Sequence, residues 1–141
     1  MSAPAPTSSP ISRVRLAVVD DHAIIRGVFV TLVEDAPELN MAWTASSLAE
    51  AADKIQLDIP DILVIDVGLP DGNGFDFTKE LLTRVPGLPV LIVSADTESS
   101  YVERAAASGA KGFIAKEASL ELLVEAVNTI QQGGQWFHPA G

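Results

Sequence analysis

The sequence predicts an α/β fold built on a doubly wound, five-stranded parallel sheet. Apolar segments with strand character alternate with amphipathic segments, and only a few residues connect one to the next. Residues 62–65 and 90–93 are continuous apolar runs, which are typical of strands buried on both faces. The length of 141 residues is well below the roughly 250 that a barrel of eight such units needs.

The strands are predicted from short apolar runs that end in polar residues. The first run ends at Asp20 and Asp21, and the third runs into Asp66. Ser94 follows the fourth run, and Lys116 follows the fifth. The five predicted strands are residues 14–19, 39–45, 61–67, 89–93 and 111–115.

The helices are predicted from apolar residues at helical spacing together with capping and stop signals. Ser47 and Glu50 form a capping box, and Ser119 is expected to cap the last helix. Gly133 marks the end of that last helix. The predicted helices are residues 23–33, 48–57, 75–85 and 98–108, and a fifth from residue 120 onward.

This order of elements also predicts where a ligand site would lie. Right-handed crossovers and this element count favour strand order 2-1-3-4-5, the flavodoxin-like arrangement. In such a sheet the site lies beyond the carboxyl ends of the strands, where the direction of winding reverses. For this order the reversal falls between the first and third strands.

Charge and composition exclude several classes of protein. Nine Lys and Arg against 19 Asp and Glu, a formal net charge of −10, argue against a nucleic-acid-binding surface. No apolar run reaches the roughly 18 residues of a membrane span, so we expect no membrane partner. The absence of cysteine fits a reducing compartment, and we expect the cytoplasm. Residues 1–12 are expected to be a flexible tail, and residues 135–141 a tail or the start of a linker.

Acidic residues follow the two strands that flank the reversal point. Asp20 and Asp21 follow the first strand, and Asp66 ends the third. Like charges this close repel one another, so three ionised carboxylates need a compensating cation. Mg²⁺ prefers oxygen ligands and is the cofactor that we expect here. Taken alone, Asp21 has a second interpretation as a helix N-cap.

Ser94 and Lys116 belong to the same edge of the predicted sheet. A Lys ammonium pairs with a carboxylate or a phosphoryl oxygen, and a Ser hydroxyl donates to such an oxygen. Singly, Ser94 is also explained as a loop residue and Lys116 as a solvated charge. Together with the acids they favour phosphoryl transfer to a carboxylate. Asp66 is the expected nucleophile because it lies at the centre of the edge, and Gly68 can bring its backbone carbonyl close to the metal.

Four segments, in this order and at these separations, resemble the receiver domain of two-component response regulators. The resemblance covers about residues 13–134. The segments are VVDDH at 18–22, DVGLPDGNG at 66–74, VSA at 93–95 and GAKGFIAK at 109–116. The resemblance implies that Asp66 accepts a phosphoryl group from a sensor histidine kinase, with Mg²⁺ bound by Asp20, Asp21, Asp66 and the backbone carbonyl of Gly68.

The resemblance also implies how such a domain switches. Lys116 would contact the phosphoryl group, and Ser94 would be the switch hydroxyl. Phe113 matches the family's switch aromatic and would move inward as Ser94 is drawn to the phosphate. The surface formed by residues 98–108, residues 111–115 and the last helix would then change. Ala95 and Asp96 are auxiliary candidates, because Asp96 could order a hydrolytic water.

The Asp-Asp-His start and the ending GGQWF at residues 133–137 further resemble the NarL/FixJ (LuxR-type) subfamily of transcriptional regulators. In that subfamily a linker and a helix-turn-helix domain follow, so any DNA binding would belong to that domain. The chain is then either the receiver part of a regulator or a stand-alone receiver that acts through protein contacts. A phosphorylation-dependent homodimer is a further expectation.

Two alternatives belong to other classes. An Asp-based phosphohydrolase would share the nucleophile and Mg²⁺ but would need a second acid and a cap over its substrate; Asp71 is the only acid in that loop. A flavin or nucleotide binder would cradle phosphate with glycine-rich loops and helix N-termini. Asp20 and Asp21 would repel such a phosphate unless a metal intervened.

Overall fold

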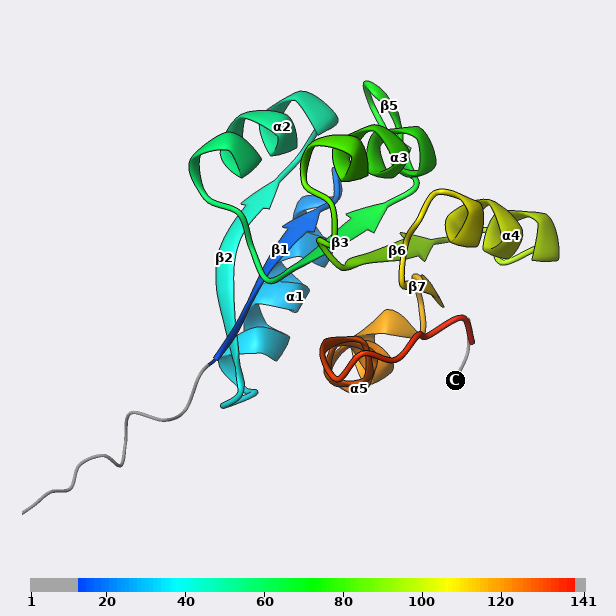
Figure 1. Ribbon diagram of the computed structural model, residues 1–141. Helices are drawn as coiled ribbons and strands as arrows, with labels where there is room; N and C mark the ends of the chain where they lie inside the picture. The colour runs from blue at the N-terminus through cyan, green and yellow to red at the C-terminus, as the bar shows by residue number, and fades with distance from the viewer. Residues whose placement is uncertain (1–12, 139–141) are drawn as a thin grey trace, which may run out of the picture.

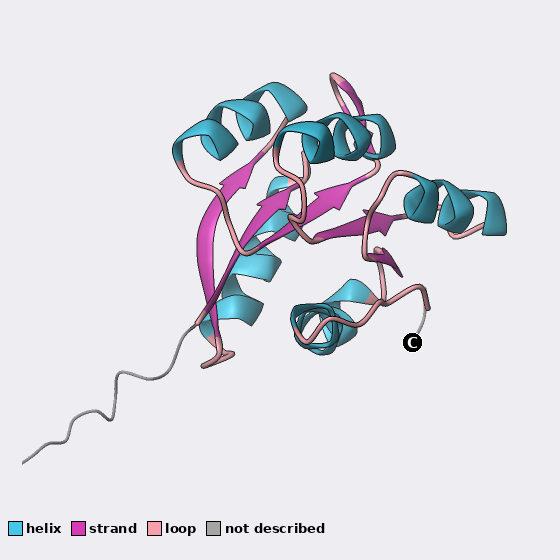
Figure 2. Cartoon of the chain, viewed as in Figure 1, coloured by secondary structure: helices cyan, strands magenta, loops and turns pink. Residues whose placement is uncertain are grey.

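A computed structural model describes residues 13–138 and shows one parallel sheet between two layers of helices (Figures 1 and 2). The sheet strands are β1 (Val14–Val19), β2 (Leu39–Ala45), β3 (Ile62–Asp66), β6 (Val90–Ser94) and β7 (Gly112–Ala115). The helices are α1 (Ala23–Glu34), α2 (Leu48–Leu57), α3 (Gly74–Arg84), α4 (Ser99–Ala107) and α5 (Ser119–Gln131). The expected tail at residues 1–12 and residues 139–141 lie outside the described residues.

The predicted strand order is confirmed. Within residues 13–138 the sheet runs β2-β1-β3-β6-β7, which is order 2-1-3-4-5 when the parallel strands alone are counted. A small antiparallel hairpin, β4 (Gly68–Leu69) with β5 (Gly72–Asn73), was not predicted. Each of its strands has two residues, which is too short to show the alternation of apolar and polar residues that predicts a strand. The sequence pattern therefore predicts a loop there.

The continuous apolar runs are explained by two separate cores, one on each face of the sheet. Ile62 and Val64 of β3 pack into a cluster with residues of α1 and α5. Leu63 and Ile65 pack into a cluster with residues of α2, α3 and α4. Because successive side chains of a strand point to opposite faces, a strand covered on both sides must be apolar at every position. Figure 1 shows the two helix layers on either side of the sheet.

Two caps hold the start of α2. Ser47 accepts a hydrogen bond from the Glu50 amide at 3.1 Å, as the capping box predicts. The Asp71 carboxylate, from the loop after β3, accepts hydrogen bonds from the amides of Leu48 and Ala49, each at 2.9 Å. These two amides lower the pKa of Asp71. Asp71 therefore acts as a cap supplied by a distant part of the chain.

The prediction that Ser119 caps the last helix was wrong. Ser119 is the first residue of α5, and Ala118 before it already has a helical backbone without a capping side chain. The Ala118 amide donates to the Ala115 carbonyl at 3.0 Å, so the chain is turning before Ser119 is reached. The Ser119 hydroxyl instead donates to the Lys116 carbonyl at 2.6 Å.

The register of the sheet brings the carboxyl ends of its central strands to one level. Asp66 lies beside Val93, and Ser94 lies beside Ala115. The residues that follow these strands therefore meet at a single edge of the sheet. No helix of the described chain is long and apolar enough to cross a membrane.

Candidate functional site

Three carboxylates and an imidazole converge at this edge. Asp20 and Asp66 are buried, with 1% and 5% of their surfaces exposed, whereas 36% of the Asp21 side chain is exposed. Asp20, Asp21, His22 and Asp66 each offer a ligand atom, and these atoms lie within 4.8 Å of one another. The helix-cap interpretation of Asp21 was wrong, because the residue at the N-cap position of α1 is His22.

Lys116 brings a positive charge from the end of β7 to these acids. Its Nζ lies 2.8 Å from Oδ2 of Asp66 and 3.3 Å from Oδ2 of Asp20. Burial lowers the pKa of Lys116, but the hydrogen bond and charge of Asp66 and the charge of Asp20 outweigh it, so that the pKa is raised overall. Lys116 is therefore a firmly protonated partner for the two buried carboxylates.

Asp66 remains poorly compensated despite this partner. Burial is the largest influence on its pKa and raises it, and the charge of Asp20 acts in the same direction. The hydrogen bond from Lys116 opposes these effects without cancelling them, so the pKa of Asp66 lies above its ordinary value. A further cation beside Asp66 would favour its ionised form.

The donor set fits a hard divalent cation. Among the described residues, Oδ2 of Asp20 is buried and accepts no well-aligned hydrogen bond, although the Lys116 ammonium lies 3.3 Å from it. Carboxylate oxygens of this kind are the ligands that Mg²⁺ takes. Gly68 begins β4 two residues after Asp66, and its amide lies 3.4 Å from Oδ1 of Asp66. The three carboxylates among the expected metal ligands therefore lie together in the fold.

His22 is a site residue to which sequence reasoning gave no role. Its Nδ1 lies 3.0 Å from Oδ1 of Asp20, 3.3 Å from Oδ1 of Asp21 and 2.8 Å from Nζ of Lys116. When protonated at Nδ1 it donates to a carboxylate, and when unprotonated there it accepts from Lys116. Its position directly after the acidic pair was the only signal in the sequence.

A cavity of about 250 Å³ opens over Asp66. It is lined by His22, Asp66, Val67, Gly68, Ser94, Ala95, Asp96, Tyr101 and Lys116. The auxiliary candidates Ala95 and Asp96 therefore border the site. Tyr101 of α4 was missed, since nothing in a weakly periodic helix marks which of its residues faces the sheet edge. Its ring packs edge to face on Phe75 with centroids 5.5 Å apart.

Ser94 lies at the site, but its hydroxyl is engaged in the following loop. It donates to the Asp96 carbonyl at 2.7 Å and accepts from the Asp96 amide at 3.0 Å. The Asp96 carboxylate in turn accepts from the Glu98 amide at 3.0 Å. Contact between Ser94 and a group on Asp66 would require the hydroxyl to leave the Asp96 carbonyl.

Phe113, the expected switch aromatic, is buried in this conformation. Its side chain has 0% of its surface exposed and belongs to the core on the α2, α3 and α4 face. The ring is therefore already inside while Ser94 is bonded to its own loop. In this conformation the Phe113 ring therefore has no exposed position from which it could move inward.

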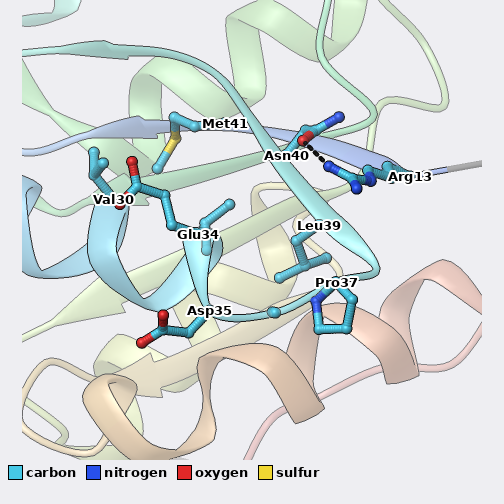
Figure 3. A pocket seen from close by; sticks show the side chains of 10 residues that line it. Arg13, Val30, Glu34, Asp35, Pro37, Leu39, Asn40 and Met41 are labelled. Atoms are coloured by element: carbon cyan, nitrogen blue, oxygen red, sulfur yellow. Dashed lines mark hydrogen bonds between the residues drawn. The ribbon is translucent and has the colours of Figure 1, made fainter.

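A second cavity lies at the opposite end of the sheet. It measures about 550 Å³ and is lined by residues of α1 and of the strand starts, with Arg13 bonded to Asn40 at 3.1 Å (Figure 3). Glu34 and Asp35 of the α1 terminus also line it. None of the site residues above belongs to this cavity.

The family comparison matches most of the chain. Residues 16–128 match the family described as the response regulator receiver domain. This range contains the three carboxylates, Ser94 and Lys116.

The first curated relatives are regulators that are longer than this chain. The DNA-binding transcriptional activator DevR/DosR of Mycobacterium tuberculosis is 37% identical over 120 residues, 85% of this chain and 55% of the relative. The transcriptional regulatory protein DegU of Brevibacillus brevis is 29% identical over 128 residues, 91% of this chain and 54% of the relative. The chain thus spans about half the length of these relatives. A protein-glutamate methylesterase of Bradyrhizobium diazoefficiens is 33% identical over 109 residues, 30% of its length.

Solved structures of the same kind superpose closely. A LuxR-family two-component response regulator from Aurantimonas has a TM-score of 0.85 at 29% identity, with 91% of each chain covered. The non-phosphorylated receiver domain of RcsB from Escherichia coli also has a TM-score of 0.85, covering 90% of this chain and 99% of that one. At 15% identity, the second likeness shows the fold alone.

Proposed function

Since the chain belongs to the response regulator receiver domain family, we propose that its Asp66 accepts a phosphoryl group from a phosphohistidine on a sensor histidine kinase. The observation that carries this proposal is the position of Asp66. It is a buried carboxylate that borders an open cavity, with the Lys116 ammonium at 2.8 Å and two further acids within ligand distance.

The transfer is a displacement at phosphorus. An ionised oxygen of Asp66 attacks the phosphorus atom, the P–N bond of the phosphohistidine breaks, and the imidazole leaves with the electron pair. Lys116, which pairs with Asp66 beforehand, then contacts an oxygen of the acyl phosphate. No separate acid is needed, because the imidazole takes its proton from solvent.

Asp20, Asp21, Asp66 and the Gly68 carbonyl are the proposed ligands of Mg²⁺. When bound, this ion offsets the charge of the phosphoryl oxygens and of the clustered acids. The unsatisfied Oδ2 of Asp20 and the raised pKa of Asp66 support a cation at this place.

Ser94 is the proposed reporter of phosphorylation. Its hydroxyl would exchange the Asp96 carbonyl for a phosphoryl oxygen, which frees the loop between β6 and α4. The surface formed by α4, β7 and α5 would then change. Because Phe113 is already buried, this change would begin at the loop and not at the aromatic ring.

The proposed output is transcriptional. The chain would be the receiver part of a cytoplasmic DNA-binding regulator, as the names of its relatives suggest. A stand-alone receiver that acts through protein contacts is the alternative. A similar segment also occurs in an enzyme, since it makes up 30% of the methylesterase relative. A phosphohydrolase is disfavoured, because the carboxylate of Asp71 is bonded to two amides of α2.

Phosphoryl uptake tests the proposal directly. The protein is incubated with acetyl phosphate and Mg²⁺, and its intact mass is measured. We expect one added phosphoryl group in the wild type and none in Asp66→Asn. Asp71→Asn, five residues along the same loop, should take up the group as the wild type does. Equal uptake by Asp66→Asn would remove the assignment.

A further inference from the structure

The chain does not leave the domain where α5 ends. Gly133, with a φ of 93°, and Gly134 reverse it: their amides donate to the carbonyls of Ile130 and Thr129, each at 3.0 Å. This is the pattern of a Schellman turn, in which a glycine takes up the left-handed conformation. The segment that follows, residues 134–138, is called the C-terminal strap here. It runs back over the edge of the sheet beyond β7 (Figure 1).

The C-terminal strap binds β7 as a sixth strand would. The Trp136 amide donates to the Lys111 carbonyl at 3.0 Å, and the Trp136 carbonyl accepts from the Phe113 amide at 2.6 Å. Trp136 forms a parallel bridge with Gly112. A Cβ atom at Gly112 would lie 2.9 Å from the Trp136 carbonyl oxygen, so glycine permits this close approach.

Side chains of the C-terminal strap reach both cores. Trp136, with 8% of its surface exposed, joins the cluster of α1 and α5. Phe137 packs against the opposite cluster, which contains Phe113 and Tyr101. This alternation is the one that a strand at the sheet edge would show.

β7 connects the C-terminal strap to the site. At its carboxyl end, the Lys116 amide is bonded to the Ser94 carbonyl at 2.8 Å, and the Lys116 ammonium is bonded to Asp66. At its other end, the Phe113 amide holds Trp136. Three residues of extended chain span only about 10 Å. A movement of Lys116 and Ser94 toward a phosphoryl group therefore acts on the strand that carries the strap.

Docking of the C-terminal strap leaves one polar group without a hydrogen bond. In the described part of the chain, the buried indole N–H of Trp136 has no hydrogen-bond acceptor. In water it would have one, so release of the ring recovers a hydrogen bond that docking forfeits. Two backbone bonds oppose release: the one that the Phe113 amide donates to the Trp136 carbonyl at 2.6 Å, and the one that the Trp136 amide donates to the Lys111 carbonyl at 3.0 Å.

We propose that the C-terminal strap is docked on β7 in the unphosphorylated protein and is released when Asp66 is phosphorylated. The strap then carries the signal from the site to the chain beyond residue 138. This inference rests on the proposed function and adds to it the route of the output.

Tryptophan fluorescence tests the release. The sequence has two tryptophans, so Trp43→Phe leaves Trp136 as the sole reporter. Beryllofluoride with Mg²⁺ serves as the phosphoryl mimic, and its binding is followed separately by ¹⁹F NMR. We expect a red shift of the emission, at least twofold stronger acrylamide quenching, and at least tenfold faster hydrogen exchange of the Phe113 amide. Trp43→Phe/Asp66→Asn should show none of these changes.

The two readouts separate the inference from its premise. Bound beryllofluoride with unchanged emission and unchanged exchange overturns strap release and leaves phosphorylation intact. No bound beryllofluoride, together with no phosphoryl uptake by intact mass, overturns the proposed function itself.

Reciprocity gives a second test. If phosphorylation weakens docking, docking must in turn weaken binding of the mimic, so a variant that cannot dock must bind it more tightly. We expect Trp136→Ala to bind beryllofluoride at least threefold more tightly than the wild type. Gln135→Ala, an exposed neighbour in the strap, should bind as the wild type does. Equal or weaker binding by a folded Trp136→Ala overturns the inference, and if this variant does not fold, the fluorescence of Trp43→Phe decides.

Discussion

Asp66 is held at the cost of some stability, because its charge is buried beside a second acid. Its pKa is raised mainly by burial, which means that the folded protein favours the neutral form. At pH 7 we expect Asp66→Asn to raise the free energy of unfolding, because the amide has no charge to bury beside Asp20. As pH falls through the raised pKa toward the ordinary value of about 3.9, the wild type gains stability and the difference closes.

Urea unfolding of both proteins at a series of pH values measures this difference. Asp53→Asn, on the exposed side of α2, removes the same charge without a buried site and serves as the control. A less stable Asp66→Asn at pH 7 would contradict the expected direction.

Glu50 is the opposite case, because its pKa is lowered and its charge therefore stabilises the folded protein. The Ser46 amide is the largest cause, followed by Lys54 and the Ser46 hydroxyl, and together they lower its pKa to about 2. The stability that its charge contributes is present above the unfolded pKa of about 4.3 and is lost as pH falls toward the folded value. With 39% of the side chain exposed, we expect Glu50→Gln to cost less than about 1 kcal/mol at pH 7. In thermal unfolding, the difference in stability between the wild type and Glu50→Gln should vanish between roughly pH 4 and pH 2. A difference that persists at pH 2 would contradict this.

The sequence predicted the residues of the site that end a strand. Asp20, Asp66 and Lys116 were found because the carboxyl ends of parallel strands share one edge. His22 and Tyr101 were missed because their approach to the site depends on how α1 and α4 pack, which no local pattern encodes. The engagement of Ser94 with Asp96 was hidden for the same reason.

At the scale of elements, α3 begins unusually close to β3. The Gly74 amide donates to the Val67 carbonyl at 2.9 Å, and a Cβ atom at Gly74 would lie 2.6 Å from the carbonyl oxygen of Asp66. We expect Gly74→Ala to cost about 1–3 kcal/mol of stability and to slow phosphoryl uptake, since Asp66 must shift.

Gly27 in α1 provides the matched control for that substitution. A Cβ atom there meets no described atom within 4 Å, so Gly27→Ala should stabilise the protein by about 0.5–1 kcal/mol through helix propensity. Equal effects of the two substitutions on unfolding and on uptake would contradict the close contact of α3 with β3.

The elements themselves were largely predictable from periodicity and caps. All five strands of the sheet in the described chain, and the helices between them, lie where the patterns indicate. The hairpin of β4 and β5 was missed, since two residues carry no period. The cap at Ser119 failed because the chain already turns at Ala118, whose amide donates to the Ala115 carbonyl.

At the scale of the molecule, the topology followed from chain connectivity and crossover handedness, but the burial of Phe113 did not. A strand residue next to an edge is buried or exposed according to what covers that edge. Here residues 136 and 137 return to cover it, and only the folded chain shows this.

Self-association is the property of the whole molecule that phosphorylation is expected to change. The altered surface of α4, β7 and α5 would present a face that a second copy can bind, while the net charge of −10 opposes association at low salt. We expect beryllofluoride with Mg²⁺ to raise the sedimentation coefficient at 0.15 M salt and above. Asp66→Asn should sediment unchanged, and an unchanged wild type at every salt concentration would remove the dimer from the proposal.

The bridge between Gly112 and Trp136 has a consequence for how the folded protein aggregates. In the part of the chain that the structure describes, one margin of the sheet is occupied by this bridge, and β2 forms the other, unpaired margin. Growth of a fibril by strand addition needs two free margins on every subunit. A folded subunit with one free margin can pair with a single neighbour through β2, so a fibril cannot grow further by strand addition.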